Sequence, residues 1–231
     1  ADVRFDAHVE RTRNRPLATG EVSRREAFIL AAVLSLAAFL LVVLFLNRAS
    51  IVWSFAALAL AASYPFTKRF FAIPQAYLGI AFGFGIPMAF VALRETVPDY
   101  GWWMLLANIF WAIAYDTEYA MVDRDDDIRI GMRTSAITFG RFDVAAVVFC
   151  YLLTLAVLMR VGQMMKFGPI YYAGLVMAGL IMAYHYTLIR DRSREGCFKA
   201  FLHNNWVGAA VFCGIAGEYL SRAKDLPWTW N

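Results

Sequence analysis

The sequence contains few charged residues, cysteines and histidines for its length. Only 17% of its 231 residues are Asp, Glu, Lys or Arg, compared with about 25% in an average soluble domain. The three cysteines, Cys150, Cys197 and Cys213, are scattered without the spacing of a metal site, and they imply no disulfide framework. The three histidines likewise show no ligand spacing. We therefore expect neither a Cys/His metal site nor a disulfide-stabilised scaffold, and no nucleic-acid partner.

Hydrophobic residues take the place of the missing charges. They make up 61% of the chain, and aromatic residues alone make up 16%, whereas a soluble domain has about 45–50% apolar residues. A helix needs roughly 20 apolar residues to cross a bilayer, and seven runs come near this length, the second and the last being short. The sequence predicts an all-α, polytopic transmembrane helical bundle with spans at about 27–46, 51–64, 75–92, 102–122, 142–159, 168–189 and 205–220.

Local signals indicate where some of these helices begin and bend. Ser23 is followed three residues later by Glu26, which is the pattern of a capping box at the start of a helix. Gly79 and Gly83 have the spacing that allows two membrane helices to approach closely. The Gly-Ile-Pro segment at 85–87 predicts a kink in the same span.

The distribution of basic residues predicts the orientation of the chain in the membrane. Seven spans place the segments 1–26, 66–74, 123–141 and 190–204 on one side. These segments hold sixteen Lys and Arg residues, and the other side holds six. Because cytoplasmic loops carry the excess of positive charge, we expect the first set of segments to be cytoplasmic.

Six acidic residues are crowded into the segment 115–127, at the end of an otherwise apolar run. If the helix continues through this segment, Asp116, Tyr119, Asp123 and Asp127 lie on one of its faces. Carboxylates at this spacing repel each other, and an Asp near the bilayer centre costs roughly 2.5–3.5 kcal/mol. A divalent cation is the natural partner for such a group.

A second acidic pair, Asp2 and Asp6, has the same spacing as Asp123 and Asp127 and is predicted on the same side of the membrane. Basic residues accompany both pairs, and they are Arg11, Arg15, Lys68, Arg69, Arg129 and Arg133. Mg²⁺ prefers one or two carboxylates together with phosphate oxygens and water, and arginine binds phosphate in a bidentate fork. Acids and arginines together therefore predict a site for Mg²⁺ and a diphosphate.

Several of these stretches carry a family resemblance. The sequence resembles the UbiA superfamily of intramembrane aromatic prenyltransferases, and within it the bacterial 4-hydroxybenzoate polyprenyltransferases. The matching stretches are 2–6, 11–17, 64–69, 115–135 and 197–205, so they extend over nearly the whole chain. The first motif of the family opens with an Asn-Asp pair, and this sequence contains only the two aspartates that follow it.

The resemblance implies a fold and an activity. The fold would have nine helices around a central cavity capped by cytoplasmic loops. The residues 1–231 would be a single transmembrane prenyltransferase domain that lacks about two N-terminal helices. The activity would be Mg²⁺-dependent transfer of a polyprenyl group from polyprenyl diphosphate to the ring carbon ortho to the hydroxyl of 4-hydroxybenzoate, in ubiquinone biosynthesis. The enzyme would lie in the bilayer of the bacterial inner membrane.

The resemblance also implies roles for individual residues. The Mg²⁺ ligands would be Asp2, Asp6, Asp123 and Asp127, and Arg69 would contact the diphosphate. Charge and predicted side add three weaker candidates for the diphosphate: Arg15, Lys68 and Arg133. Tyr119, on the predicted face of Asp123, is a further candidate for contact with substrate.

Simpler interpretations remain open for each feature. The acidic cluster could be a solvated helix end, and cytoplasmic loops are basic whatever their function. The histidines and Asn108, Asn204 and Asn205 are better explained as hydrogen-bonded structural residues. Three other functions are compatible with part of the pattern: a prenyltransferase with another aromatic acceptor, a membrane phosphotransferase for lipid alcohols, and a cation-coupled transporter. The phosphotransferases carry an Asp-Gly-x-x-Ala-Arg signature that this sequence lacks.

Overall fold

The chain folds into helices, as the sequence predicts. The computed structural model describes residues 12–67 and 69–224, and these residues contain no strand. The helices are, in chain order, α2 (Pro16–Thr19), α3 (Arg24–Phe45), α4 (Arg48–Thr67), α5 (Pro74–Gly83), α6 (Gly85–Arg94), α7 (Asp99–Val122), α8 (Arg124–Arg129), α9 (Ser135–Phe139), the 3₁₀ turn η1 (Gly140–Phe142), α10 (Asp143–Met164), α11 (Pro169–Ile189) and α12 (Arg194–Lys224).

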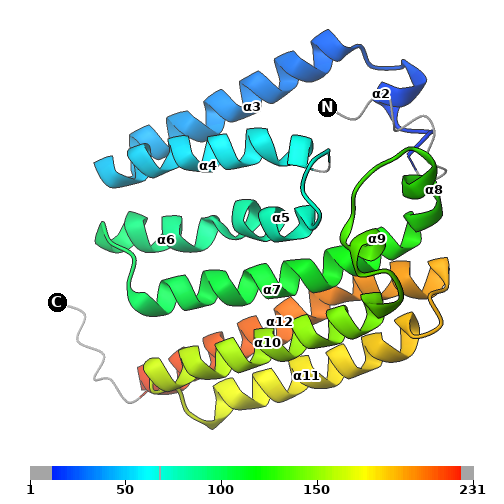
Figure 1. Cartoon of the computed structure of the whole chain (residues 1–231). Helices are drawn as coiled ribbons and strands as arrows, with labels where there is room; N and C mark the ends of the chain where they lie inside the picture. Colours follow the sequence, from blue (N-terminus) through cyan, green and yellow to red (C-terminus); the bar gives the residue numbers. More distant parts are fainter. Residues whose placement is uncertain (1–11, 68, 225–231) are drawn as a thin grey trace.

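The long helices lie side by side and alternate in direction (Figure 1). The connections that follow α4, α7 and α11 are therefore at the same end of the bundle, together with α2, α8 and α9. This end carries the acidic stretch and most of the basic residues. The structure thus confirms, for the parts of these segments that it describes, that the predicted loops share one end, and the cytoplasmic location of that end stays a prediction.

The described part of the chain has five helical segments that are long and apolar enough to cross a membrane. They are Arg24–Phe45, Arg48–Thr67, Pro74–Arg94, Ser135–Met164 and Pro169–Ile189. Two of the seven expected spans, in α7 and α12, are not among these five. Both run alongside the other long helices in Figure 1.

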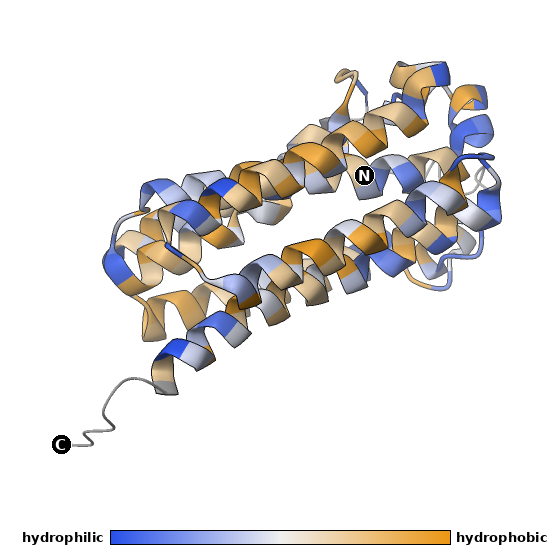
Figure 2. Cartoon of the chain, turned by 90° about the horizontal axis from the view of Figure 1, so that it is seen from below, coloured by the Kyte–Doolittle hydropathy of each residue, from blue (hydrophilic) through white to orange (hydrophobic). Residues whose placement is uncertain are grey.

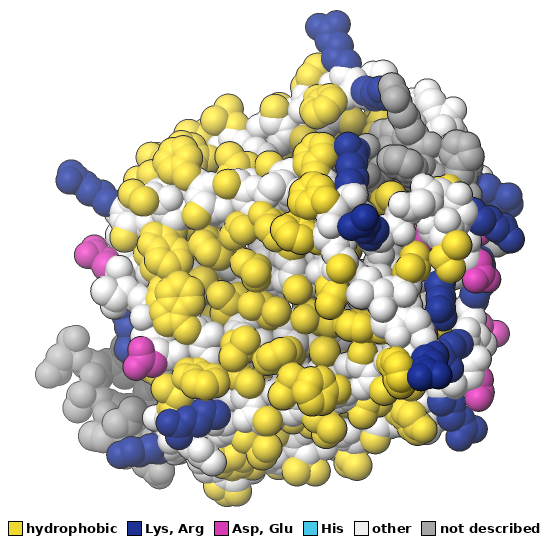
Figure 3. All heavy atoms as spheres, viewed as in Figure 1, with side chains coloured by type: hydrophobic (Ala, Val, Ile, Leu, Met, Phe, Trp, Pro, Cys, Tyr) yellow, Lys and Arg dark blue, Asp and Glu magenta, His cyan; other side chains and the backbone are white. Residues whose placement is uncertain are grey.

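Apolar side chains cover the flank of the bundle between its charged ends. Figure 3 shows hydrophobic atoms over the middle of one face and Lys, Arg, Asp and Glu at the two ends. Figure 2 shows the same gradient along the helices. Phe28, Phe82 and Leu93 are each at least 75% exposed. Removing apolar surface from water is favourable by about 25 cal/mol per Å², so side chains this exposed are stable in lipid and unfavourable in water. This is therefore a multi-pass membrane protein.

Two local predictions are confirmed. The backbone N–H of Glu26 donates to Ser23 Oγ at 3.2 Å, and the backbone N–H of Ser23 donates to Glu26 Oε2 at 2.8 Å, which completes the capping box of α3. The predicted kink is the break between α5 and α6, which leaves Phe84 between Gly83 and Gly85.

The bounds predicted for the second span are wrong at both ends. Its helix, α4, begins at Arg48 because the side chain of Asn47 accepts a hydrogen bond from the backbone N–H of Ser50 at 2.8 Å, as an N-cap residue does. It runs through Pro65 to Thr67. Proline removes one backbone hydrogen-bond donor. Because Pro65 lies only two residues before the end of α4, the missing hydrogen bond does not end the helix.

The main core lies between α7, α10, α11 and α12. Small residues of α7, including Ala114 and Ala120, are buried against Tyr151 of α10, Ala178 of α11 and others. By contrast, no residue of α3 is buried. The end of α7 is therefore held by three neighbouring helices, which gives the acidic stretch that follows it a rigid support.

Gly79 marks the closest approach of α5 to α7. A Cβ atom at this position would lie 2.8 Å from the Cα of Ile109, so a larger residue must push the two backbones apart. We expect Gly79→Leu to lower the free energy of unfolding by about 1–3 kcal/mol, the usual cost of overpacking. Thermal unfolding in lipid nanodiscs would measure this. Gly85→Leu is the matched control, because a Cβ at Gly85 meets no atom within 4 Å.

Candidate active site

The acidic stretch forms a turn between α7 and α8. Helix α7 ends at Val122, Asp123 has backbone angles of −97° and 6°, and α8 begins at Arg124. The predicted end of the fourth span, at about residue 122, is therefore confirmed, whereas the helix does not continue unbroken through Asp123. Asp is a poor residue for a helix interior, and carboxylates are stabilised near a helix N-terminus, where α8 places Asp125 to Asp127.

The predicted spacing of Asp123 and Asp127 survives this break. The backbone N–H of Asp127 donates to the carbonyl oxygen of Asp123 at 2.9 Å, so the two residues are still one helical turn apart. Asp123 is 7% exposed and Asp127 is half-buried, whereas Asp125 is exposed. Asp123 and Asp127 therefore provide two carboxylates in a sheltered turn at the end of the bundle.

A third acid of this turn, Asp126, is paired with arginines of the protein. Its Oδ2 lies 3.5 Å from Nη1 of Arg194, at the start of α12, and its Oδ1 lies 3.8 Å from Nη1 of Arg129. Asp126 is 8% exposed. A carboxylate buried to this degree needs a partner, and the pair with Arg194 connects α8 to α12. The sequence did not distinguish Asp126 from its neighbours.

A buried ion cluster around Asp143 supports the same end of the bundle. Asp143 begins α10 and is fully buried. Its carboxylate lies 2.7 Å from Nη2 of Arg192 and 3.4 Å from Nη1 of Arg124. The hydrogen bond to this carboxylate raises the pKa of Arg192. Arg124 directly follows Asp123, so Asp143 fixes the backbone next to the acidic turn.

Arg192 has a left-handed backbone conformation, with a φ of 54°. This conformation costs a residue other than glycine of order 1–3 kcal/mol. The contact with Asp143 and the hydrogen bond from Nη2 of Arg192 to the carbonyl oxygen of Arg141, at 2.9 Å, offset that cost. The loop between α11 and α12 is thereby held against the start of α10.

Two basic candidates lie in segments that contact each other. Nη1 of Arg133 donates to the carbonyl oxygen of Phe70 at 3.0 Å, and the hydroxyl of Thr138 donates to the carbonyl oxygen of Ala72. Arg69, one residue before Phe70, places its guanidinium 5.2 Å from the ring centre of Phe66. The structure therefore brings the loop of Arg69 against the segment of Arg133.

Hydrogen bonds attach these segments to α7 as well. The backbone N–H of Ser135 donates to Oε1 of Gln75 at 3.1 Å, and its hydroxyl lies 2.7 Å from that of Thr117. All three residues are buried. Gln75 belongs to α5, Thr117 to α7 and Ser135 to α9, so the helix that leads into the acidic turn is joined to two others at one point.

Tyr119 packs against α12. Its ring centre lies 4.5 Å from that of Phe201, with a tilt of 36° between the rings. Phe201 belongs to the 197–205 stretch that carried the resemblance. Tyr119 is half-buried, and its ring contact with Phe201 is sufficient to account for an aromatic residue at this position. Its contact with substrate stays a prediction.

Of the remaining predicted residues, Arg15 belongs to the described part of the chain and three others do not. Arg15 is exposed and precedes α2, where its carbonyl oxygen accepts from the backbone of Ala18 at 2.8 Å. Asp2, Asp6 and Lys68 lie outside the described residues. Figure 1 shows α2 at the same end of the bundle as α8.

A buried polar network below the acidic turn was not predicted as a unit. Glu118 is fully buried and accepts hydrogen bonds from Tyr151 and Asn204, each at 2.8 Å. Tyr151 also lies 3.0 Å from Nδ1 of His185, whose Nε2 lies 3.0 Å from Nδ1 of His203. The structural interpretation of Asn204 and of these two histidines is confirmed. Glu118 could have been noticed as a charged residue inside an apolar run.

The donor atoms of the turn suit a hard divalent cation. Among residues 12–67 and 69–224, no group of three or more His, Cys, Asp and Glu side chains could hold a metal ion by itself. Mg²⁺ does not need one, since it is commonly bound by one or two carboxylates with phosphate and water. Asp123 and Asp127 provide oxygen ligands of this kind. The residues therefore fit a metal that is bound together with a phosphorylated ligand.

The Asp143 cluster predicts a stability effect. Asp143→Asn removes a buried charge and leaves Arg192 and Arg124 without their partner, so we expect a loss of about 1–3 kcal/mol in unfolding free energy. Asp191→Asn is the matched control, because Asp191 is exposed and lies 3.7 Å from Arg190, and exposed pairs contribute about 0–1 kcal/mol. Equal thermal unfolding of the two variants in nanodiscs would show that the cluster is not stabilising.

Comparison with known proteins finds a matching family model and relatives of similar sequence. The family model of the UbiA prenyltransferase family matches residues 1–207. The chain is 62% identical, over 98% of its length and 76% of the relative, to the 4-hydroxybenzoate octaprenyltransferase of Dechloromonas aromatica (strain RCB). It is 66% identical, over 95% of its length and 76% of the relative, to the protein of the same name from Azoarcus sp. (strain BH72).

A solved structure agrees with these sequence comparisons. The apo structure of a UbiA homolog from Aeropyrum pernix K1 superposes with a TM-score of 0.77 at 25% identity, covering 91% of this chain and 80% of that one. The family model covers most of the sequence, and the relatives exceed half identity over almost all of it. The chain therefore belongs to the UbiA prenyltransferase family.

Proposed function

We propose that the protein transfers a polyprenyl group from polyprenyl diphosphate to 4-hydroxybenzoate, at the ring carbon ortho to the hydroxyl. The observation that carries this proposal is the sheltered turn of Asp123 and Asp127 at the end of a membrane bundle. The names of relatives that are 59–66% identical support the choice of acceptor and donor. The proposed place of the reaction is ubiquinone biosynthesis.

Mg²⁺ is the proposed cofactor, held by Asp123 and Asp127. When bound, it would stabilise the negative charge that develops on the departing diphosphate. Asp2 and Asp6, outside the described residues, are proposed as the second pair of ligands.

Basic residues around the turn are proposed to bind the diphosphate. Arg69 is exposed, and its loop contacts the segment of Arg133. A guanidinium offers paired donors that match phosphate oxygens. Arg15 and Lys68 are proposed as further diphosphate contacts on charge alone. Holding the leaving group at the charged end of the bundle leaves the prenyl chain to extend along apolar helices.

The reaction then requires three bond changes that a sheltered site favours. The bond between the first prenyl carbon and the diphosphate oxygen breaks, and a bond to the ring carbon forms. The substituted ring carbon then gives its proton to the released diphosphate or to water, and the ring regains aromaticity. Aromatic side chains such as Tyr119 and Phe201 can stabilise positive charge on the prenyl group, by about 0.5–2 kcal/mol for each ring face.

The proposed location is the bacterial inner membrane, with the acidic turn on the cytoplasmic side. The excess of Lys and Arg in the segments at this end supports the orientation. Polyprenyl diphosphates are amphipathic, so a site at the membrane surface reaches both the charged and the apolar part of the donor.

The activity can be tested in membranes that contain the protein. Incubation with 4-hydroxybenzoate and a polyprenyl diphosphate should give the C-prenylated acid, detected by mass spectrometry. A chelator should abolish product, and added Mg²⁺ should restore it. Product formation that is unaffected by the chelator would contradict the metal, and absence of product with all components would contradict the function.

Replacement of the turn carboxylates tests the site. We expect Asp123→Asn and Asp127→Asn each to lower kcat/KM by at least about 10²-fold, the usual cost of losing a transition-state charge partner. Asp125→Asn is the matched control, because Asp125 is exposed in the same turn and has no proposed role. Near-normal turnover of either test variant, at normal expression and folding, would reject the assignment.

Replacement of Arg69 tests the diphosphate contact. A hydrogen bond to a charged group contributes about 1.5–3 kcal/mol, so Arg69→Ala should raise KM for the prenyl donor roughly 10- to 100-fold, with a smaller effect on KM for 4-hydroxybenzoate. Arg25→Ala, an exposed arginine at the start of α3, should leave both values unchanged. Equal effects of Arg69→Ala on both substrates would argue against a diphosphate contact.

A further inference from the structure

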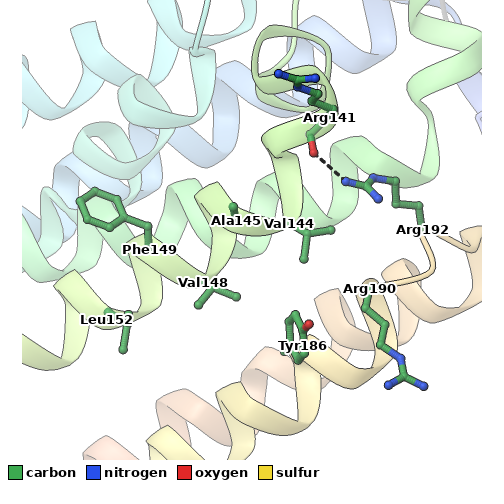
Figure 4. A pocket seen from close by; sticks show the side chains of 9 residues that line it. All are labelled: Arg141, Val144, Ala145, Val148, Phe149, Leu152, Tyr186, Arg190 and Arg192. Carbon is green, nitrogen blue, oxygen red and sulfur yellow. Dashed lines mark hydrogen bonds between the residues drawn. The ribbon is translucent and has the colours of Figure 1, made fainter.

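A groove runs along the outer surface of the bundle between α10 and α11. One part of the groove has a volume of about 550 Å³. It is lined by Arg141, Val144, Ala145, Val148, Phe149, Leu152, Tyr186, Arg190 and Arg192. Figure 4 shows the apolar side chains along the two helices and the three arginines at one end. None of the acids of the proposed active site lines it.

The apolar part of this groove continues down the same two helices. A second cavity of about 320 Å³ shares Val148, Leu152 and Tyr186 with the first. It extends past Leu155 to Gly179 of α11. The two cavities therefore form one channel on the lateral surface, with arginines at the end that also carries the acidic turn.

The arginine end has an excess of positive charge. The guanidinium of Arg192 pairs with buried Asp143, and the same carboxylate also pairs with Arg124. Arg190 lies 3.7 Å from Asp191, and the guanidinium of Arg141 lies 4.7 Å from the ring centre of Phe142. Two carboxylates thus accompany four arginines. In Figure 4 the side chains of Arg141 and Arg190 extend on opposite sides of the mouth.

The walls of the groove exclude a purely polar ligand. Phe149 and Leu152 are each 60% exposed on the flank that the bilayer covers. A molecule that satisfies both parts must have an anionic head at the level of the lipid headgroups and a hydrocarbon chain beside α10 and α11. Basic pockets between membrane helices at the cytoplasmic side bind anionic lipid headgroups in this manner.

We propose that the groove between α10 and α11 is a binding site for an anionic phospholipid. The phosphate lies between Arg141 and Arg190, and one acyl chain follows Val148, Leu152 and Leu155. Arg192 holds the mouth in shape through Asp143. The site is separate from the proposed prenyl-donor site, because it opens toward the bilayer and does not include the acidic turn.

Native mass spectrometry of the purified protein with added tetraoleoyl cardiolipin tests the charged end. Each arginine near a membrane surface contributes a free energy that corresponds to roughly fivefold in affinity. Arg141→Gln and Arg190→Gln should therefore each raise the dissociation constant about fivefold. Arg94→Gln and Arg160→Gln, which remove the same charge from exposed positions elsewhere, should not change it. Equal loss in both pairs would overturn the proposal.

A bulky residue in the groove tests the apolar part independently of charge. Ala145 is exposed and lines the groove, and Ala156 is exposed on the same helix but does not line it. Ala145→Trp should weaken cardiolipin binding several-fold, and Ala156→Trp should not. Both variants should bind dioleoyl phosphatidylcholine as weakly as the unaltered protein does.

Two competition experiments distinguish the phospholipid from other anions. Inorganic phosphate at millimolar concentration should not displace cardiolipin, because it cannot fill the apolar channel. Geranylgeranyl diphosphate should not displace it either, since the donor is proposed to bind at the acidic turn. Displacement by phosphate would make this an anion site only, and displacement by the diphosphate would make it a substrate site. Either result would overturn the proposal.

Discussion

Compensation of buried acidic charge is the constraint on which the functional end of this bundle depends. Asp143 is fully buried and paired with Arg192 and Arg124, and Asp126 is paired with Arg194. Without these arginines, the carboxylates would be too costly at the end of an apolar bundle. The same pairs fix the turn that presents Asp123 and Asp127. The protein's own arginines thus stabilise Asp126 and Asp143, and we propose that the turn they fix binds Mg²⁺ through Asp123 and Asp127.

Much of the fold could be predicted because its signals are local. The apolar runs, the Ser23–Glu26 capping box and the kink near Gly85 all depend on residues close in sequence. Five of the seven predicted spans, the capping box and the kink are confirmed. The predicted end of the fourth span at about residue 122 agrees with the end of α7, but the start of a new helix at Arg124 could not be predicted from periodicity. It depends on the balance between continuing α7 and starting α8, whose first turn stabilises three aspartates.

The sequence predicts which kinds of residue form the site, but it does not predict which acidic side chain pairs with which partner. Six acids in one segment indicate a charged site, yet sequence does not tell Asp126, paired across to Arg194, from the proposed metal ligands beside it. Glu118 belongs to the same segment but points to Tyr151 and Asn204 on two other helices. Such partners are 33 and 86 residues away along the chain, and only the packing of α7 against α10 and α12 reveals them.

The most direct test is whether a metal ion at the acidic turn touches the diphosphate. Mn²⁺ can replace Mg²⁺, and electron–nuclear double resonance detects phosphorus nuclei coordinated to it. With a non-reactive prenyl diphosphate analogue bound, we expect phosphorus coupling in the unaltered protein and its loss when Asp123 and Asp127 are both changed to Asn, with the coupling kept in Asp125→Asn. Coupling that is unchanged in the double variant would contradict the assignment of this turn as the metal–diphosphate site.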